Sequence, residues 1–236
     1  MRSAPFTRRT LLGYAAGTAA AIAVAPTALA DQPPLGTLLD YSAAVPAAAS
    51  IRAAGHAGVI RYVSDRRPGA EWMLGKPLRA DEVDALRVAG LSIVSNYQYG
   101  KGPTADWRGG LEAGKRCADR GLQLHRVAGG PDAAPIYASI DDNPSQAEFF
   151  ELIAPYLQGW QSVAGNARVG VYANSPTIER ARNAGLGSYF WQHNWGTPRG
   201  FVHPSANLHQ TQINRASVDG IAVDLNNILT RNYGQW

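Results

Sequence analysis

Strand-like runs alternate with helix-like stretches along most of this chain, and this alternation restricts its fold more than any other feature. Eight runs rich in β-branched, aromatic and apolar residues lie at Thr37–Asp40, Gly58–Val63, Ser92–Tyr97, Pro135–Asp141, Arg168–Tyr172, Ser188–Gln192, Leu208–Gln212 and Ile221–Leu225. Five amphipathic stretches separate the first six runs, at Pro46–Ala54, Ala80–Ala89, Asp106–Arg120, Ser145–Val163 and Pro176–Ala184. Such alternation predicts an α/β fold with a parallel sheet.

The helix caps and the segment after the fifth helix indicate which α/β fold the chain adopts. Candidate C-caps and N-caps flank the helices, at Gly55, Gly90, Gly121, Gly185, Ser145 and Ser175. After the fifth helix the connections are rich in Asn, Gly, Pro and His and show no helical period, so the last three strands lack helices. We therefore predict a TIM-barrel-like fold of five βα units followed by three further strands. An open doubly wound sheet is the alternative.

Residues 1–30 have the pattern of a cleavable export signal. Arg8 and Arg9 precede a short apolar stretch, and Ala28–Ala30 has the small-residue pattern of a cleavage site. The paired arginines resemble a twin-arginine signal, so we expect secretion through the twin-arginine machinery. Residues 31–236 then form one domain. The alternative is an uncleaved N-terminal anchor, although the apolar stretch is shorter than a membrane span.

Charge and motif content exclude several classes of function. The formal charge of +4 includes three leader arginines, so the remaining chain carries 19 basic against 18 acidic residues and no nucleic-acid partner is indicated. The sequence has no phosphate-binding loop, dinucleotide fingerprint, nucleophile elbow or zinc-protease motif, and its five histidines lack metal-ligand spacing. We therefore predict no cofactor and no metal.

Polar side chains gather at the predicted carboxyl ends of the strands, where the active sites of parallel α/β folds lie. The candidate catalytic residues are Asp40, Asp141, Asp142 and Asp224. The candidate substrate-binding residues are Arg61, Tyr97, Tyr137, Asn174, Trp191, Gln192, His193 and Gln210. Carboxyl groups converging among aromatic side chains fit hydrolysis of a glycosidic bond, which needs one protonated acid and one carboxylate. The competing interpretation is that these aspartates are helix caps and ion-pair partners.

Strand alternation separates the two neighbouring aspartates of the fourth run. Tyr137, Ser139 and Asp141 share one face of that strand, whereas Asp142 belongs to the other. We expect Asp141 to point into the barrel. Asp142 is either a second acid reached by a distorted strand end or an ordinary turn residue before the following helix.

Six segments resemble, in the same order, the glycoside-hydrolase-like domain of unknown function 1906, an actinobacterial family of exported proteins proposed to act on peptidoglycan. They are Leu39–Ser42, Val59–Asp65, Ile136–Asp141, Val169–Tyr172, Tyr189–Gln192 and Val223–Asn226. The chain is more distantly similar to the glycoside hydrolase family 25 lysozymes, whose fold is a barrel of five strand-helix units and three further strands. The resemblance implies that Asp40, Asp141 and Asp224 are the conserved acids of the family pattern and that the partner is a cell-wall glycan.

One departure from the lysozymes leaves two functions open. The lysozymes carry Asp-x-Glu at the fourth strand, with the glutamate as proton donor, whereas this chain has Asp141, Asp142 and Asn143 there. We predict a monomeric, cell-wall-associated glycosidase that uses Asp141 or Asp142 as its acid. The alternative is a non-catalytic glycan-binding protein on the same barrel.

Overall fold

The strands form a closed barrel. The structure, a computed structural model, describes residues 33–236. Its strands are β1 Gly36–Asp40, β2 Gly58–Tyr62, β3 Ser92–Tyr97, β4 Ile136–Ser139, β5 Val169–Asn174, β6 Tyr189–His193, β7 Leu208–Val218 and β8 Ile221–Ile228, and they pair in chain order around the ring. Neighbours from β1 to β7 pair in parallel, and β8 pairs antiparallel with both β7 and β1. The TIM-barrel-like prediction is confirmed, and the open doubly wound sheet is wrong.

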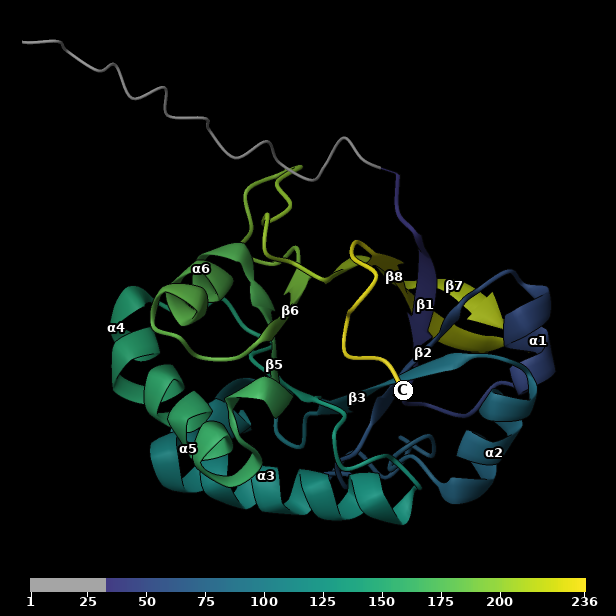
Figure 1. Ribbon diagram of the computed structural model, residues 1–236, viewed down its shortest axis with the longest axis horizontal. Helices are drawn as coiled ribbons and strands as arrows, with labels where there is room; N and C mark the ends of the chain where they lie inside the picture. Colours follow the sequence, from purple (N-terminus) through teal and green to yellow (C-terminus); the bar gives the residue numbers. More distant parts are fainter. Residues whose placement is uncertain (1–32) are drawn as a thin grey trace, which may run out of the picture.

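Helices surround the first six strands (Figure 1). They are α1 Ala48–Ala53, α2 Ala80–Val88, α3 Gly110–Val127, α4 Gln146–Glu148, α5 Ala154–Ala164 and α6 Ser175–Asn183, with 3₁₀ turns at Gly102–Thr104, Asp106–Gly109 and Asn166–Arg168. A π-helical segment, Phe149–Ile153, joins α4 to α5 in one helical stretch. Over residues 33–236, no helix is both long enough and apolar enough to cross a membrane.

Two predicted helix ends are wrong. Gly121 does not end its helix, because α3 continues to Val127 and the glycine lies buried inside it against Tyr97 and Trp160. Asn174, not Ser175, is the N-cap of α6, since its side chain accepts a hydrogen bond from the backbone N–H of Thr177. By contrast, Ser145 caps α4 in a capping box with Glu148, as predicted.

Alternate residues of each strand divide the core into two parts. Leu38, Ile60 and Val94 belong to an interior cluster inside the barrel. Their strand neighbours Leu39 and Val59 belong to the larger cluster between the sheet and the helices. Because both faces are buried, the strands read as nearly continuous apolar runs.

Residues 233–236 close the end of the barrel opposite the carboxyl ends of the parallel strands. The Tyr233 carbonyl accepts a hydrogen bond from the Tyr137 hydroxyl at 2.8 Å, and the Tyr233 hydroxyl lies 2.9 Å from Ser92 Oγ. Trp236 exchanges two backbone hydrogen bonds of 2.9 Å with Ile93. The C end accordingly lies beside β3 in Figure 1.

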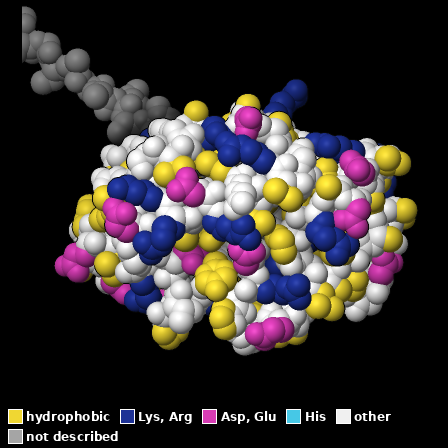
Figure 2. All heavy atoms as spheres, turned by 90° about the horizontal axis from the view of Figure 1, so that it is seen from below, with side chains coloured by type: hydrophobic (Ala, Val, Ile, Leu, Met, Phe, Trp, Pro, Cys, Tyr) yellow, Lys and Arg dark blue, Asp and Glu magenta, His cyan; other side chains and the backbone are white. Residues whose placement is uncertain are grey.

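Charges of both signs are interspersed on the face that Figure 2 shows. Lys and Arg side chains alternate there with Asp and Glu side chains, and no large area of that face carries one sign alone. This distribution agrees with the nearly balanced charge of the chain after residue 30.

Candidate active site

The carboxyl ends of the strands surround a cleft at the barrel mouth. Two adjoining cavities of about 230 and 460 Å³ form it. They share Lys101, Asp141, Tyr172, Gln210 and Ile213 as lining residues. We call this continuous space the mouth cleft. Asp40 and Asp224 line the smaller cavity, so three of the four predicted catalytic aspartates meet in one place.

Asp40 is the most deeply placed of these acids. It ends β1, is 3% exposed, and accepts hydrogen bonds from Asn226 Nδ2 at 2.8 Å and Tyr62 Oη at 3.3 Å. Burial, reinforced by the charge of Asp224, raises the pKa of Asp40 to about 7, although its hydrogen bonds oppose the shift. Asp40 therefore holds a proton at neutral pH to an extent that an exposed aspartate does not.

Asp224 lies beside Asp40 because the two residues pair across β8 and β1. A single donor, Gln210 Nε2, reaches Asp224 at 3.0 Å and Asp40 at 3.3 Å. The backbone N–H of Asn214 also donates to Asp224 at 2.8 Å. Burial raises the pKa of Asp224, and the nearby charge of Asp141 adds to the increase.

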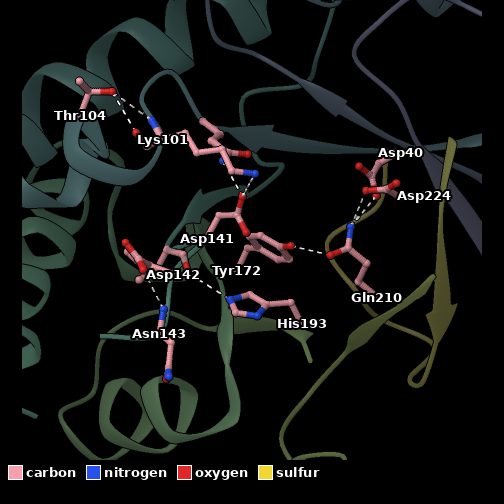
Figure 3. Close-up of polar contacts among 12 residues, drawn as sticks. Asp40, Lys101, Thr104, Asp141, Asp142, Asn143, Tyr172, His193, Gln210 and Asp224 are labelled. Atoms are coloured by element: carbon pink, nitrogen blue, oxygen red, sulfur yellow. Dashed lines mark hydrogen bonds and ion pairs between the residues drawn. The ribbon is translucent and has the colours of Figure 1, made fainter. Parts of the chain in front are cut away.

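Two aromatic donors in the barrel fix the amides that hold Asp40. The Tyr172 hydroxyl donates to Gln210 Oε1 at 2.6 Å, which turns the Gln210 amide nitrogen toward the acids (Figure 3). In the same way, Trp191 Nε1 donates to Asn226 Oδ1 at 2.9 Å. The carboxyl positions are thus set by buried groups with a single hydrogen-bonding arrangement.

Asp141 lies across the mouth cleft from the Asp40–Asp224 pair (Figure 3). It follows β4 and points into the cleft, as the strand alternation predicts. Gln98 Nε2 donates to its carboxylate at 3.1 Å, and Lys101 Nζ forms an ion pair with it at 3.0 Å. One cation and one amide donor thus hold the Asp141 side chain at the mouth cleft.

A buried lysine links the two sides of the mouth cleft. Lys76 Nζ lies 3.9 Å from the centre of the Tyr62 ring and donates to the Gln98 carbonyl at 2.9 Å. Tyr62 in turn contacts Asp40, and the Gln98 side chain contacts Asp141. Burial lowers the pKa of Lys76 to about 7, so this ammonium readily loses its proton near neutral pH.

Asp142 and Asn143 point away from the mouth cleft. Asp142 forms an ion pair with Arg108 at 3.4 Å. Asn143 Oδ1 accepts a hydrogen bond from Asn174 Nδ2 at 2.9 Å and lies against Gly196. Neither residue lines the cleft, because at the end of β4 Asp141 is the inward residue and Asp142 the outward one. The structure therefore does not bring Asp142 together with the other three predicted catalytic aspartates.

Three predicted substrate-binding residues face the helices instead of the mouth cleft. Arg61 is fully buried, pairs with Glu82 and donates to the Tyr41 carbonyl. Tyr97 packs edge-on against Trp160, and Gln192 donates to the Phe201 carbonyl. All three lie outside the mouth cleft for the same reason: each has the outward parity of its strand.

The remaining predicted residues support the mouth cleft or line it. Tyr137 and Trp191 point inward but lie below the cleft within the interior cluster, and Asn174 is used as the cap of α6. His193 and Gln210 line the cleft as predicted. His193 Nε2 lies 3.2 Å from the Ile140 carbonyl, and burial lowers the pKa of His193, which favours the neutral ring.

Several residues that line the mouth cleft were not predicted from the sequence. Tyr62, Gln98 and Lys76 are among them, and so are Trp72 and Trp195. The inward parity of Tyr62 two residues after Ile60 could have indicated it, whereas the others lie on loops where no periodicity applies. Within residues 33–236, no three His, Cys, Asp or Glu side chains group closely enough to hold a metal ion.

The sequence matches a known family over most of its length. Residues 49–228 match the family described as the Rv2525c-like, glycoside hydrolase-like domain. The chain belongs to this family. The Mycobacterium tuberculosis protein Rv2525c, named as a proposed peptidoglycan hydrolase, is 56% identical over 238 residues, which cover 97% of this chain and 98% of that protein.

Solved structures agree with the barrel. The crystal structure of the Tat-secreted Rv2525c of M. tuberculosis in complex with L-tartrate has a TM-score of 0.85 and 61% identity, and covers 86% of this chain and 99% of that one. The lysozyme of Streptomyces coelicolor has a TM-score of 0.55 at 18% identity, and covers 82% of this chain and 91% of that one. At that identity the lysozyme supports the fold alone.

Proposed function

We propose that this protein is an exported glycoside hydrolase that cleaves peptidoglycan or a related N-acetylated cell-wall glycan. One observation carries the proposal: the mouth cleft brings together a proton-bearing acid, Asp40, and an ion-paired carboxylate, Asp141. Two carboxyl groups in contrasting environments are what glycosidic hydrolysis requires. The relationship to Rv2525c, a protein named for peptidoglycan hydrolysis, supports the same substrate class.

The environments of the two acids assign their roles. Asp40 donates its proton to the leaving glycosidic oxygen, because burial and Asp224 keep that proton bound near neutral pH. Asp141 faces the sugar as a carboxylate, where it stabilises the positive charge that develops at the anomeric carbon or orients a participating N-acetyl group. This assignment differs from the sequence-based one, which gave the proton to Asp141 or Asp142.

Export and location belong to the same proposal. Residues 1–30 lie outside the described residues, and their paired arginines remain the basis for expecting twin-arginine export and removal of the leader. The M. tuberculosis relative is described as Tat-secreted, which supports that route. We propose that the mature protein, residues 31–236, acts as a monomeric domain at the cell wall.

Binding without cleavage is the second candidate. Asn143 occupies the sequence position at which the lysozymes carry their acid, and its amide is engaged by Asn174 outside the mouth cleft. If the reaction requires an acid at that position, the barrel retains a glycan-binding cleft but lacks its proton donor.

Hydrolysis of purified peptidoglycan by the protein beginning at Asp31 separates the two functions. We expect new reducing ends from the wild type, and loss of at least about a hundredfold in rate for Asp40→Asn and Asp141→Asn. Asp142→Asn is the matched control, because the same substitution there falls outside the mouth cleft. Co-sedimentation with the wall without any fragments would favour the binding protein, and equal loss in the control would refute the assignment of the acids.

A further inference from the structure

Two exposed tryptophans lie at opposite sides of the mouth cleft. Trp72 lines the smaller cavity and is 58% exposed, and Trp195 lines the larger cavity and is 56% exposed. A large aromatic side chain that is exposed to water at a cleft can bury its apolar face against a bound ligand. None of the roles assigned above uses either ring.

The barrel topology places these side chains across the carboxylates from one another. Trp72 lies on the loop after β2, and Trp195 lies on the loop after β6. In a closed ring of eight strands, β2 and β6 are four strands apart in either direction and are therefore diametrically opposed. Asp141 and Gln210 line both cavities and so lie between the part of the cleft with Trp72 and the part with Trp195, whereas Asp40 and Asp224 line the smaller cavity with Trp72.

The chemistry of the mouth cleft fits one kind of occupant. Sugars present apolar C–H faces to aromatic rings and hydroxyl or amide groups to polar side chains. The cleft offers both surfaces: the smaller cavity has Trp72 with Asp40 and Asp224, Asp141 and Gln210 line both cavities, and the larger cavity has Trp195. Ile213, which is 58% exposed and lines both cavities, continues the apolar surface between them. A chain of linked sugars matches this order better than a compact small molecule does.

We propose that Trp72 and Trp195 are two sugar-stacking platforms, one on each side of the bond to be cleaved, so that the protein binds internal segments of an N-acetylated glycan chain. This inference rests on the proposed function, since it takes the same cleft and the same substrate class. It adds the residues that determine glycan length and the position of the cut within the chain.

Binding to N-acetylated oligosaccharides of increasing length tests the two platforms. The measurement is tryptophan fluorescence or calorimetry with the Asp141→Asn protein, which leaves the glycan uncut, and with Trp72→Ala and Trp195→Ala added singly to it. For long oligosaccharides we expect each added substitution to weaken binding about tenfold. For the shortest oligosaccharide that binds, only one of the two substitutions should have that effect.

Controls separate lost stacking from lost folding. Phe150→Ala removes a ring that is also 58% exposed but does not line the mouth cleft, and it should not change affinity. Trp72→Phe and Trp195→Phe keep a stacking ring and should retain most of the binding. Unchanged affinity for long glycans in both alanine variants would overturn the platforms while leaving hydrolysis by the wild type intact. Wild-type hydrolysis that fails while both tryptophans still govern binding would instead refute the proposed activity alone.

Discussion

Burial of one carboxyl group next to another accounts for the chemistry proposed for the mouth cleft. Asp40 is surrounded by amide and hydroxyl donors, yet desolvation outweighs them and raises its pKa from 3.8 to about 7. A fully buried charge costs more than two or three neutral hydrogen bonds return. The same environment therefore keeps a proton on Asp40 near neutral pH and reduces the stability of the fold once that proton is lost.

Asp40→Asn should change how stability depends on pH. The pKa of Asp40 is higher in the folded than in the unfolded protein. Its contribution to folding stability is therefore fully present below about pH 4 and is lost as the pH rises through about 7. We expect the free energy of unfolding of the wild type to fall relative to Asp40→Asn between pH 5 and pH 8, by at most about 3 kcal/mol. Urea titrations across that range measure the difference. Asp142→Asn is the control, and parallel pH profiles for wild type and Asp40→Asn would contradict the raised pKa.

The buried pair of Arg61 and Glu82 should be essential for stability. Arg61 is fully buried and donates to Glu82 Oε2 at 3.1 Å and to the Tyr41 carbonyl at 2.7 Å. Arg61→Met leaves Glu82 buried without its cation, which should cost about 3 to 5 kcal/mol of unfolding free energy. Denaturant midpoints measure this loss.

A matched control is available on the same side of the barrel. Arg79 and Asp81 form an exposed ion pair at 3.0 Å, and Arg79→Met should leave the denaturant midpoint unchanged. If Arg61→Met kept full stability and lost only glycan affinity, the sequence-based assignment of Arg61 to substrate binding would be restored.

Three of the four aspartates predicted from the sequence lie together in the mouth cleft, whereas several of the side chains predicted to surround them do not. Asp40, Asp141 and Asp224 could be found because carboxyl ends of parallel strands converge. Arg61 and Tyr97 were placed in the cleft wrongly because both faces of a barrel strand are buried, so the apolar pattern does not reveal which way a polar side chain points.

At the scale of elements, α3 and α5 approach closely because glycines lie where they cross. A methyl group added at Gly114 would overlap the Tyr156 carbonyl oxygen, which belongs to the backbone of α5. A Gly-to-Ala change in an open helix interior is normally stabilising by up to about 1 kcal/mol. Because the backbones of α3 and α5 are in contact at Gly114, the same change should be destabilising there.

Gly114→Ala should therefore lower the free energy of unfolding by about 1 to 3 kcal/mol, because the helices must separate to admit the methyl group. Gly121→Ala in the same helix is the comparison. Its added methyl would meet side-chain carbons of Tyr97 and Trp160 at 3.0 and 3.1 Å, and side chains shift more readily than backbone. Thermal unfolding of both variants tests the order, and a larger loss for Gly121→Ala would refute it.

A predicted helix end was wrong where a glycine contributes to tertiary packing instead of ending a helix. A glycine at position 121 is typical of a helix end, but here it lies inside α3, where the close approach of Tyr97 and Trp160 favours a residue without a side chain. The last hairpin is longer than predicted, since β7 extends to Val218 and turns through Asp219 and Gly220, both at positive φ. Asp-Gly is a strong hairpin signal, and it could have extended the seventh predicted strand to Val218 from sequence alone.

On the scale of the whole molecule, the barrel separates its two ends by role. The acids, the two lysines and the exposed aromatic rings gather at the mouth cleft. Tyr233 and Trp236 fill the opposite end with hydrogen bonds and apolar contacts. This division is typical of barrels whose carboxyl-end loops carry function and whose opposite face carries stability.

Deletion of residues 233–236 should therefore weaken the fold without altering the chemistry of the mouth cleft. It removes the acceptor of the Tyr137 hydroxyl and the partner of the Ile93 backbone, and it opens the interior cluster to water. We expect a loss of more than about 3 kcal/mol in the free energy of unfolding, by denaturant titration. Gln235→Ala, at an exposed position, is the control for local change. Well below its lowered melting temperature, the shortened protein should keep the glycan affinity of the full chain, because the residues to which Tyr233 and Trp236 hydrogen-bond, Ser92, Ile93, Ser95 and Tyr137, do not line the mouth cleft. Lost affinity in a still-folded protein would show that the two ends are coupled.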